Sequence, residues 1–357
     1  MGVKLNFAFY ISNHGYGHAA RNIPLIEKLW KDNRNNRIFI KTDSERIAMI
    51  KRNLTHCNER IIYCEGYQEC GVLFREGCLE VDAERMQREV KKEIASWAGL
   101  IEEEKKLLIR DNIDVVVSDV TPWVLLAAKE LKIPSVLISN FTWYDHYRLY
   151  LGKEYADPYK ECYASADKAL LYELHVGQMA EYCGRSEAVS LVARTGNFHK
   201  AEEIRQRYRA PIVFVSVGMS VSLTEEIDVE NLPYTFIVTQ GVLLKGSNVV
   251  SLPDTVINTM DYISASEYVV TKCGWSTVSE ILLSGKKCAL LAYSDSLEEK
   301  ALLAKVTARN NGIKISFEDF RDNLGGVLRQ LESLDGDYSM YRDDRERIVR
   351  VICGMGR

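Results

Sequence analysis

The sequence predicts an α/β protein built from two doubly wound domains, and three observations support this. Short runs of apolar and β-branched residues alternate with longer stretches of helical periodicity, which is typical of parallel sheets covered by helices. The alternation starts again at Pro211–Val217, and a glycine-containing loop follows the first strand of each half. Ligands of open α/β sheets bind at that end of the strands. We therefore expect two Rossmann-like domains facing a cleft, at residues 1–200 and 201–337.

Composition and charge exclude several classes of function. The chain has 357 residues, of which 46% are hydrophobic, and its net charge of −4 gives no support to nucleic-acid binding. No apolar run is long enough to span a bilayer, and the N-terminal run leads into a glycine loop, as a first strand does and a signal peptide does not. Nine cysteines without C-x-x-C pairs argue against a disulfide framework or a zinc site. We expect a cytoplasmic protein with reduced thiols and no required metal or cofactor.

The loop after the first strand carries two histidines, His14 and His18. Read literally, its G-x-G-x-x-A pattern fits the dinucleotide-binding fingerprint, and Asp43 lies at a suitable distance for ribose, which leaves a nicotinamide-dependent oxidoreductase as one alternative. Histidine side chains fit poorly in a turn that this fingerprint keeps small. The glycines alternatively allow the loop to bring both histidines to the carboxyl end of the sheet.

A second candidate lies at the end of the strongly apolar strand Asp114–Asp119. A carboxylate on one ring nitrogen of a histidine raises the basicity of the other nitrogen and stabilises the imidazolium. Asp119 and His18 both follow strands, so they can meet at one edge of the sheet and act as a general base with its orienting acid. In the alternative reading, each of them only caps a helix.

An aromatic segment follows the next predicted strand, at Ser139–Tyr150. Aromatic rings suit an acceptor pocket because they stack on the apolar faces of sugars and aglycones. The same residues can instead form a helix that packs on the core. The predicted acceptor residues are His14, Asn140, Phe141, Trp143 and Tyr144.

The stretch Tyr268–Gly285 combines a strand, a tight turn at Gly274 and a helix start. A helix start presents unpaired N–H groups and the positive end of its dipole, so it suits a phosphate. Lys272 adds charge, and Glu280, one turn later, is placed to accept hydrogen bonds from sugar hydroxyls. An ordinary capped helix is the alternative.

These motifs resemble those of glycosyltransferases with the GT-B fold. The donor box T-H-C-G-W-N-S-x-x-E of plant-type members has a similar segment here, with Lys272 in place of its histidine, and bacterial lipid-linked-sugar transferases carry a looser T-[IV]-S-E version. The first loop, G-Y-G-H-x-x-R, is similar to nucleotide-sugar hydrolases and to the transferase-like region of sugar-kinase fusions. The matching box residues are Thr271, Cys273, Gly274, Trp275 and Glu280.

The resemblance implies an inverting transferase that moves a hexosyl or N-acetylhexosaminyl group from a nucleotide-diphosphate sugar, most commonly a UDP-sugar, to an acceptor hydroxyl. His18 is then the general base and Asp119 its partner. Relatives carry an acid–Gln pair where this chain has Glu298 and Glu299, which leaves the donor sugar open. The donor-binding residues that the resemblance and the helix start together predict are Gly17, Gly218, Met219, Ser220, Lys272, Gly274, Trp275, Ser276, Thr277, Glu280, Glu298 and Glu299. The acceptor is expected to be a small or lipid-linked molecule, and peripheral contact with a membrane is left open. A C-terminal helix within 338–357 is expected to pack back on the first domain. A nucleotide-sugar hydrolase, an epimerase and a binding module without turnover remain alternatives.

Overall fold

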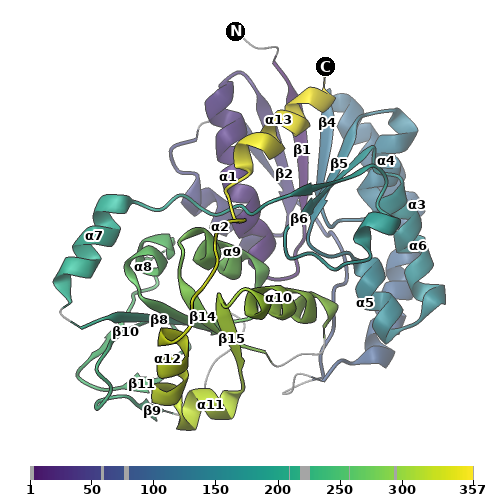
Figure 1. The fold of residues 1–357 in the computed structure, drawn as a ribbon. Helices are drawn as coiled ribbons and strands as arrows, with labels where there is room; N and C mark the ends of the chain where they lie inside the picture. Colours follow the sequence, from purple (N-terminus) through teal and green to yellow (C-terminus); the bar gives the residue numbers. More distant parts are fainter. Residues whose placement is uncertain are drawn as a thin grey trace. The chain divides into compact units, whose positions relative to one another are not determined.

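The computed structural model describes residues 4–57, 60–75, 80–208, 210–217, 226–256, 258–292 and 296–356, and Figure 1 shows their helices and strands. The chain divides into two compact units. The first comprises Met1–Leu191, Ser296–Glu298 and Asp344–Arg357, and the second comprises Val192–Asp295 and Glu299–Asp343. Each unit contains one large parallel sheet.

The sheet of the first unit has seven parallel strands in the order β3-β2-β1-β4-β5-β6-β7. Its strands are β1 (Asn6–Ile11), β2 (Arg37–Thr42), β3 (Ile61–Glu65), β4 (Val115–Asp119), β5 (Ser135–Ser139), β6 (Lys168–Tyr172) and β7 (Ser186–Val189). The central strands are buried along their whole length, which explains their continuous apolar sequences. The strand order reverses between β1 and β4, and this is the topological switch point of the sheet.

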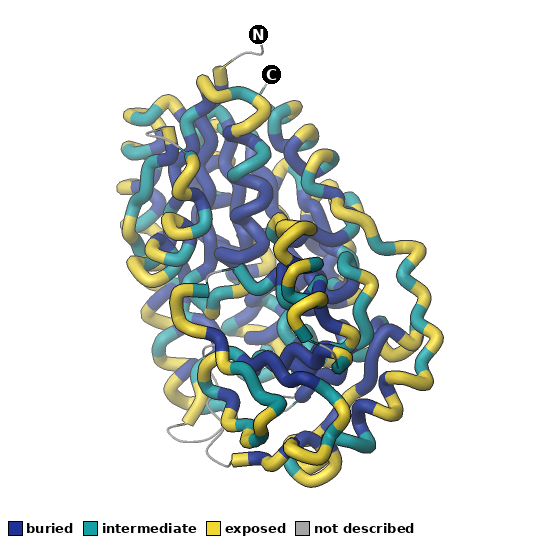
Figure 2. Tube along the Cα trace, turned by 90° about the vertical axis from the view of Figure 1, so that its left-hand side faces the viewer, coloured by how far each residue is buried: buried dark blue, intermediate teal, exposed yellow. Residues whose placement is uncertain are grey.

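Helices cover both faces of this sheet (Figure 1). They are α1 (Gly17–Asp32), α2 (Ser44–Asn53), α3 (Ala83–Arg110), α4 (Trp123–Leu131), α5 (Trp143–Tyr150), α6 (Lys153–Ala164) and α13 (Arg345–Met355), with a short 3-10 helix, η1 (Met179–Glu181). Helix α1 packs against α2 and α13, whereas α3 packs against α4 and α6. Right-handed crossovers that leave the switch point in opposite directions place α1 and α4 on opposite faces. In the Cα trace of Figure 2, the buried residues, in dark blue, lie inside and the exposed residues, in yellow, lie toward the outside.

The second unit repeats this plan with a six-stranded parallel sheet in the order β12-β10-β8-β13-β14-β15 and a separate two-stranded sheet of β9 and β11. Its strands are β8 (Ile212–Ser216), β9 (Ile227–Asp228), β10 (Thr235–Val238), β11 (Leu244–Lys245), β12 (Val249–Ser251), β13 (Tyr268–Lys272), β14 (Lys287–Leu291) and β15 (Gly312–Ile315). Its helices are α7 (Phe198–Arg207), α8 (Met260–Ala265), α9 (Trp275–Leu283), α10 (Leu297–Ala308), α11 (Phe317–Asp322) and α12 (Leu324–Glu332). The switch point lies between β8 and β13.

Residues 192–200, which we assigned to the first domain, belong to the second unit. Hydrogen bonds to the second sheet's helices explain this. The Ser279 hydroxyl donates to the Val192 carbonyl at 2.6 Å, and the Asn197 N–H donates to the Asp261 carboxylate at 2.6 Å. Asn323 separates α11 from α12, since it is the C-cap of the first helix and the N-cap of the second.

The C-terminal helix α13 belongs to the first unit. Asp344 joins it to the strand that leaves β7: its N–H donates to the Leu191 carbonyl at 2.9 Å, and its carboxylate accepts from the Ser190 N–H at 2.7 Å. The apolar face of α13 lies on α1 and β4, and Ile352 is completely buried there. The last helix therefore forms part of the core of the first unit.

Replacing Ile352 by alanine should lower the free energy of unfolding by about 2–5 kcal/mol, because a buried side chain is lost and a cavity remains. Chemical denaturation followed by circular dichroism measures this. Gly99→Ala is a suitable control, since Gly99 is exposed within α3 and an added methyl group meets no atom there. It should stabilise the protein by about 0.5–1 kcal/mol. An unchanged unfolding free energy for Ile352→Ala would contradict the packing of α13 on the first unit.

Candidate active site

The first unit places His18 and Asp119 together at the switch point of its sheet. Strand β1 pairs with β4 in a register that sets Ile11 beside Asp119, and His18 is the second residue of α1 after the glycine loop. The Nδ1 atom of His18 lies 3.0 Å from Oδ1 of Asp119, and both side chains are almost completely buried. The loop thus closes the distance between two strand ends that the sheet already brings side by side.

Two further residues of α1 complete the hydrogen bonding of Asp119. The Arg21 guanidinium makes a bidentate pair with it: Nε donates to Oδ2 at 2.7 Å, and Nη2 donates to Oδ1. The Asn22 amide also donates to Oδ2, and it donates to the His18 carbonyl at 2.9 Å. With His18 on Oδ1, each carboxylate oxygen accepts two hydrogen bonds, which is the full capacity of a carboxylate.

Burial and Arg21 set the charges of this group. Burial alone would raise the pKa of Asp119, but Arg21 and His18 outweigh it and hold that pKa at about 2. Burial lowers the pKa of His18, and the positive charge of Arg21 lowers it further, while Asp119 and Glu298 act in the opposite direction. The net result is a neutral imidazole beside an ionised carboxylate at pH 7, although the carboxylate alone would raise the pKa of the histidine.

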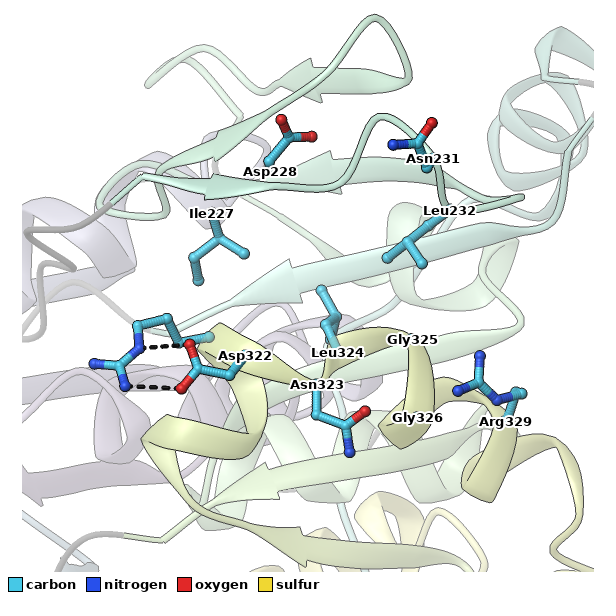
Figure 3. A pocket seen from close by; sticks show the side chains of 11 residues that line it. Ile227, Asp228, Asn231, Leu232, Asp322, Asn323, Leu324, Gly325, Gly326 and Arg329 are labelled. Carbon is cyan, nitrogen blue, oxygen red and sulfur yellow. Dashed lines mark hydrogen bonds and ion pairs between the residues drawn. The ribbon is translucent and has the colours of Figure 1, made fainter.

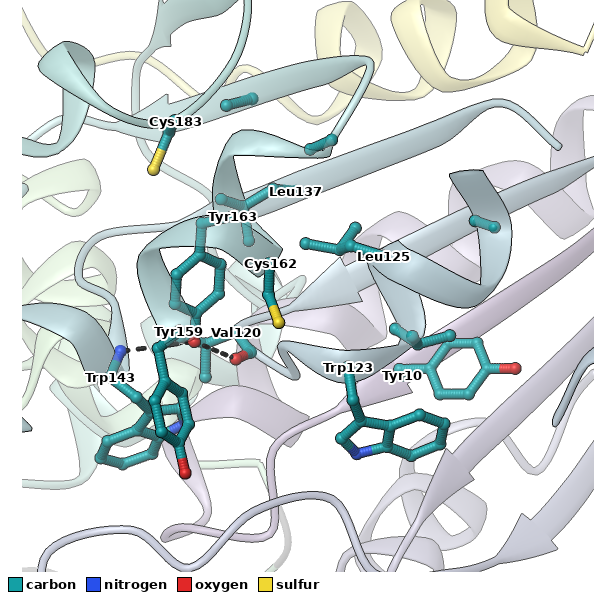
Figure 4. Packing of buried hydrophobic residues seen from close by; sticks show 14 of the residues in the cluster. Tyr10, Val120, Trp123, Leu125, Leu137, Trp143, Tyr159, Cys162, Tyr163 and Cys183 are labelled. Atoms are coloured by element: carbon teal, nitrogen blue, oxygen red, sulfur yellow. Dashed lines mark hydrogen bonds between the residues drawn. The ribbon is translucent and has the colours of Figure 1, made fainter. Parts of the chain in front are cut away.

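The backbone just after Asp119 is strained. Val120 has a φ of +67°, a left-handed conformation that β-branched residues rarely adopt, and it is completely buried. Figure 4 shows how it is held: the Tyr163 hydroxyl donates to the Val120 carbonyl at 2.7 Å and accepts from the Trp143 N–H at 3.4 Å. The Tyr163 hydroxyl thus fixes the backbone directly after Asp119.

A buried glutamate lies close to the same loop. Glu69 is fully buried, accepts from the Ser12 hydroxyl and from the Thr121 hydroxyl (3.3 Å for the latter), and burial raises its pKa to about 8. Ser12 in turn accepts from the His14 N–H at 3.0 Å. Gly71, on the same segment as Glu69, has a φ of +76°, and a Cβ there would come within 2.4 Å of the His14 ring. The 66–71 segment therefore fixes the position of His14.

The predicted acceptor residues fall into three positions. The Trp143 ring contacts the rings of His14 and Phe141 edge to face, with centroids 5.2 and 5.1 Å apart, and Phe141 also contacts the His18 ring at 5.6 Å. Asn140 is completely buried: its carbonyl oxygen accepts from Arg21, and its amide donates to Glu298 at 2.9 Å. Tyr144 lies apart from this cluster and packs on Tyr182. Phe141 is thus the predicted acceptor residue whose ring contacts the His18 ring.

In the second unit, the donor box forms the strand, turn and helix that its sequence predicts. Strand β13 ends at Lys272, Gly274 precedes α9 without any side-chain cap, and the buried Trp275 begins that helix. Strand β13 is the neighbour of β8, so the start of α9 lies at the switch point of the second sheet. Ser276 and Thr277, in the first turn, are partly exposed. The predicted residues Gly218, Met219 and Ser220 lie outside the described residues.

Glu280 is held by an arginine from the connection between the units. Nε and Nη2 of Arg194 donate to its two carboxylate oxygens at 2.6 and 3.0 Å, and Nη2 also donates to the Thr259 hydroxyl at 3.2 Å. Glu280 is 2% exposed. This bidentate pair fixes the orientation of the carboxylate and still leaves each oxygen one further lone pair for a ligand hydroxyl.

The two glutamates at the start of α10 have different surroundings. Glu298 clusters with the first unit and receives the hydrogen bond from Asn140, while Glu299 belongs to the second unit, where its carbonyl lies 3.8 Å from the Cys273 sulfur.

A separate pocket of about 430 Å³ lies elsewhere in the second unit, between β9 and the α11–α12 turn (Figure 3). None of the predicted site residues lines it.

Sequence reasoning missed four residues of these sites: Arg21, Asn22, Glu69 and Arg194. Arg21 was visible only as the last letter of the G-Y-G-H-x-x-R motif, one helical turn after His18. Glu69 lies in a segment without periodicity, and Arg194 lies in a polar connection. Asp43, which the dinucleotide reading needs, caps α2 by accepting from the Arg46 N–H at 2.9 Å and pairs with the Arg46 side chain at 2.8 Å. That reading therefore gains no support.

Solved glycosyltransferase structures share this architecture, so the chain has the GT-B fold, as its sequence predicted. The glycotransferase of kitacinnamycin matches with a TM-score of 0.64 at 15% identity, over 99% of this chain and 96% of that one. Arabidopsis thaliana UGT89C1, complexed with UDP, matches with a TM-score of 0.63 at 10% identity, over 98% and 100%. Phytolacca americana UGT2, complexed with UDP-2fluoro-glucose and pterostilbene, matches with a TM-score of 0.65 at 11% identity, over 98% and 94%.

By sequence, the chain is similar to an L-arabinokinase of Arabidopsis thaliana, with 25% identity over 306 residues. The match covers 78% of this chain and 27% of the relative, so the chain spans about a quarter of that protein's length. The likeness to sugar-kinase proteins that the first loop indicated is thereby confirmed. No protein-family model matches the sequence. In the described part of the chain, no helix combines the length and apolarity that crossing a membrane requires.

The raised pKa of Glu69 predicts a pH-dependent stability. The fold favours the protonated form, so this contribution is complete below the ordinary pKa of 4.5 and is lost as the pH rises through about 8. The side chain of Glu69→Gln stays neutral at every pH. The free energy of unfolding of this variant, relative to that of wild type, should therefore be higher at pH 8.5 than at pH 5 by more than about 1 kcal/mol. Urea unfolding at both pH values measures this, and Glu84→Gln, an exposed acid on α3, is the control. A pH-independent difference would show that Glu69 ionises normally.

Proposed function

We propose that the protein is an inverting glycosyltransferase that uses a UDP-sugar and an acceptor hydroxyl. The observation that carries this proposal is the buried His18–Asp119 pair at the switch point of the first sheet of a GT-B fold. Uridine is the favoured base because two solved structures with this fold are described as complexes with UDP or a UDP-sugar. Structures of this fold are also described as complexes with pterostilbene and with quercetin, which favours a small molecule with a hydroxyl group as the acceptor here.

In this mechanism, Nε2 of His18 accepts the proton of the acceptor hydroxyl while Nδ1 keeps its hydrogen bond to Asp119. The acceptor oxygen forms a bond to the anomeric carbon as the bond from that carbon to the diphosphate oxygen breaks, and the electron pair leaves with the diphosphate. A single displacement inverts the anomeric centre. The lowered pKa of His18 supports this role, since the ring is neutral and available as a base at pH 7.

The second unit would bind the donor. The N–H groups at the start of α9, with Lys272 and the hydroxyls of Ser276 and Thr277, would stabilise the charge that develops on the diphosphate. Glu280, oriented by Arg194, would accept hydrogen bonds from ribose hydroxyls. Glu298 and Glu299 would meet the transferred hexose or N-acetylhexosamine. Because these groups would stabilise the diphosphate without a metal ion, we expect turnover to persist when EDTA removes metal ions.

A nucleotide-sugar hydrolase is the second candidate, and the G-Y-G-H-x-x-R loop favours it. The two are separated by incubating the protein with UDP- and GDP-sugars, with and without an acceptor panel. L-Arabinose and UDP-L-arabinose belong in the panel because a relative is described as an L-arabinokinase. Acceptor-dependent formation of a glycoside with inverted configuration, read by NMR, supports the transferase. Equally fast sugar release without acceptor would establish the hydrolase instead.

Replacing His18 by alanine should lower kcat by about 10²–10⁴-fold, because the acceptor loses its general base. The affinity for UDP should stay unchanged, since this side chain does not bind the nucleotide in the proposal. Isothermal titration calorimetry and initial rates measure the two quantities. His199→Ala, an exposed histidine on α7, is the control. A His18→Ala rate equal to that of this control would refute the assignment of the base.

Replacing Glu280 by glutamine should raise the Kd for UDP by about 10- to 100-fold, the cost of weakening charge-assisted hydrogen bonds to the ribose. The Kd for inorganic diphosphate, which has no ribose, should change little. Glu318→Gln, an exposed acid on α11, serves as the control in the same titrations. A wild-type Kd for UDP in Glu280→Gln would restrict this residue to its pairing with Arg194.

A further inference from the structure

Three atoms in the first unit form a close triangle: Nδ1 of His18, Oδ1 of Asp119 and Nη2 of Arg21. Nδ1 lies 3.0 Å from Oδ1 and 2.9 Å from Nη2, and Nη2 also donates to Oδ1. A guanidinium only donates. A hydrogen bond from Arg21 to Nδ1 therefore requires an unprotonated Nδ1, whereas a hydrogen bond from Nδ1 to Asp119 requires a protonated one. The two arrangements exclude each other, and they place the base of His18 on different nitrogens.

The donors of Arg21 decide between these arrangements. Nε donates to Oδ2 of Asp119, and Nη2 has two acceptors apart from the histidine, Oδ1 and the Ser139 hydroxyl at 3.3 Å. Nη1 donates to the Asn140 carbonyl oxygen. Both hydrogens of Nη2 therefore have acceptors other than the imidazole. A lone pair on Nδ1 would instead face a carboxylate oxygen at 3.0 Å, which is repulsive.

We propose that Arg21 is a positioning residue for His18: its guanidinium fixes the Asp119 carboxylate so that Nδ1 of His18 stays protonated and Nε2 is left as the base. The assignment deepens the proposed function and rests on it for the catalytic meaning of Nε2. Arg21 reaches this role through Asp119 and contacts no substrate in it.

The position of Arg21 is itself fixed from the other side. Asn140 is fully buried between Arg21 and Glu298, accepting from one and donating to the other. The contacts form one chain from Glu298 through Asn140, Arg21 and Asp119 to His18. An arginine is needed at its centre because only the planar guanidinium reaches both carboxylate oxygens and the amide together.

Arg21 also affects the pKa of His18 through its charge. The charged groups that face His18 are Arg21 on its own helix, Asp119 from β4 and Glu298 from α10, and Glu69 lies close to Asp119. Arg21 is the cation among them. Removing its charge while keeping a polar side chain should therefore raise the pKa of the histidine.

The test is a titration of the histidine ring by ¹⁵N NMR in the free, full-length protein, with the His18 signal assigned by its loss in His18→Gln. Wild type should show a neutral ring protonated at Nδ1. Arg21→Gln should raise the pKa of His18 by about one unit or more, and the acid limb of the kcat/KM profile should shift by the same amount. Arg21→Lys keeps the charge but loses the bidentate geometry, so it should leave this pKa near wild type and lower kcat about tenfold or more.

Arg88→Gln, an exposed arginine on α3, removes an equal charge and should change neither quantity. A wild-type ring protonated at Nε2 would overturn the proposal, and so would an unshifted pKa in folded Arg21→Gln. Arg21→Lys decides the kinetic part if Arg21→Gln does not fold: a wild-type kcat there would also overturn it. Because the NMR readout needs no substrate, a protein that transfers no sugar but titrates as expected would refute the proposed function and leave the role of Arg21 intact.

Discussion

The ion pair between Asp119 and Arg21 is the constraint on which the site of the first unit depends. Removing two charges from water costs several kcal/mol for each ion, and only a saturated geometry compensates for this. The geometry here is saturated: Asp119 accepts four hydrogen bonds, three of them from Arg21 and Asn22 of α1. The pair therefore fixes α1 against the end of β4, and His18 at the start of that helix comes with it. Structural cohesion and the orientation of the histidine have the same cause.

Both units place their candidate residues by the same rule of topology. In each sheet the strand order reverses beside the first strand, and this is the place where open α/β sheets bind their ligands. The first unit fills this place with side chains from α1 and β4, which suits proton transfer. The second unit presents the start of α9 after Gly274, with no side-chain cap, which suits an anion. One fold repeated twice thus offers two different chemistries.

Periodicity predicted the sheets and most helices, because strands buried on both faces must be continuously apolar. Two strand-end motifs pointed to His18 and to Asp119, and the register of β1 and β4 brings them into contact. Arg21 and Asn22 escaped notice because polar residues in a helix ordinarily face water, and only the strand order reveals that this helix face is buried. Glu69 and Arg194 lie in irregular segments, where no repeat indicates which residues are buried.

The environment of His18 balances two requirements of a general base. A histidine that faces a carboxylate alone has a raised pKa, which makes it a stronger base but protonates more of it at neutral pH. Burial against Phe141 and the charge of Arg21 act in the opposite direction, while Asp119 keeps its hydrogen bond and stays ionised. In the proposed mechanism the ring is therefore neutral before the reaction, and the carboxylate that would stabilise the imidazolium is already in place. Arg21 would let a single carboxylate orient the histidine through Nδ1 while Nε2 stays unprotonated at neutral pH, which is why an arginine beside a candidate base is compatible with catalysis.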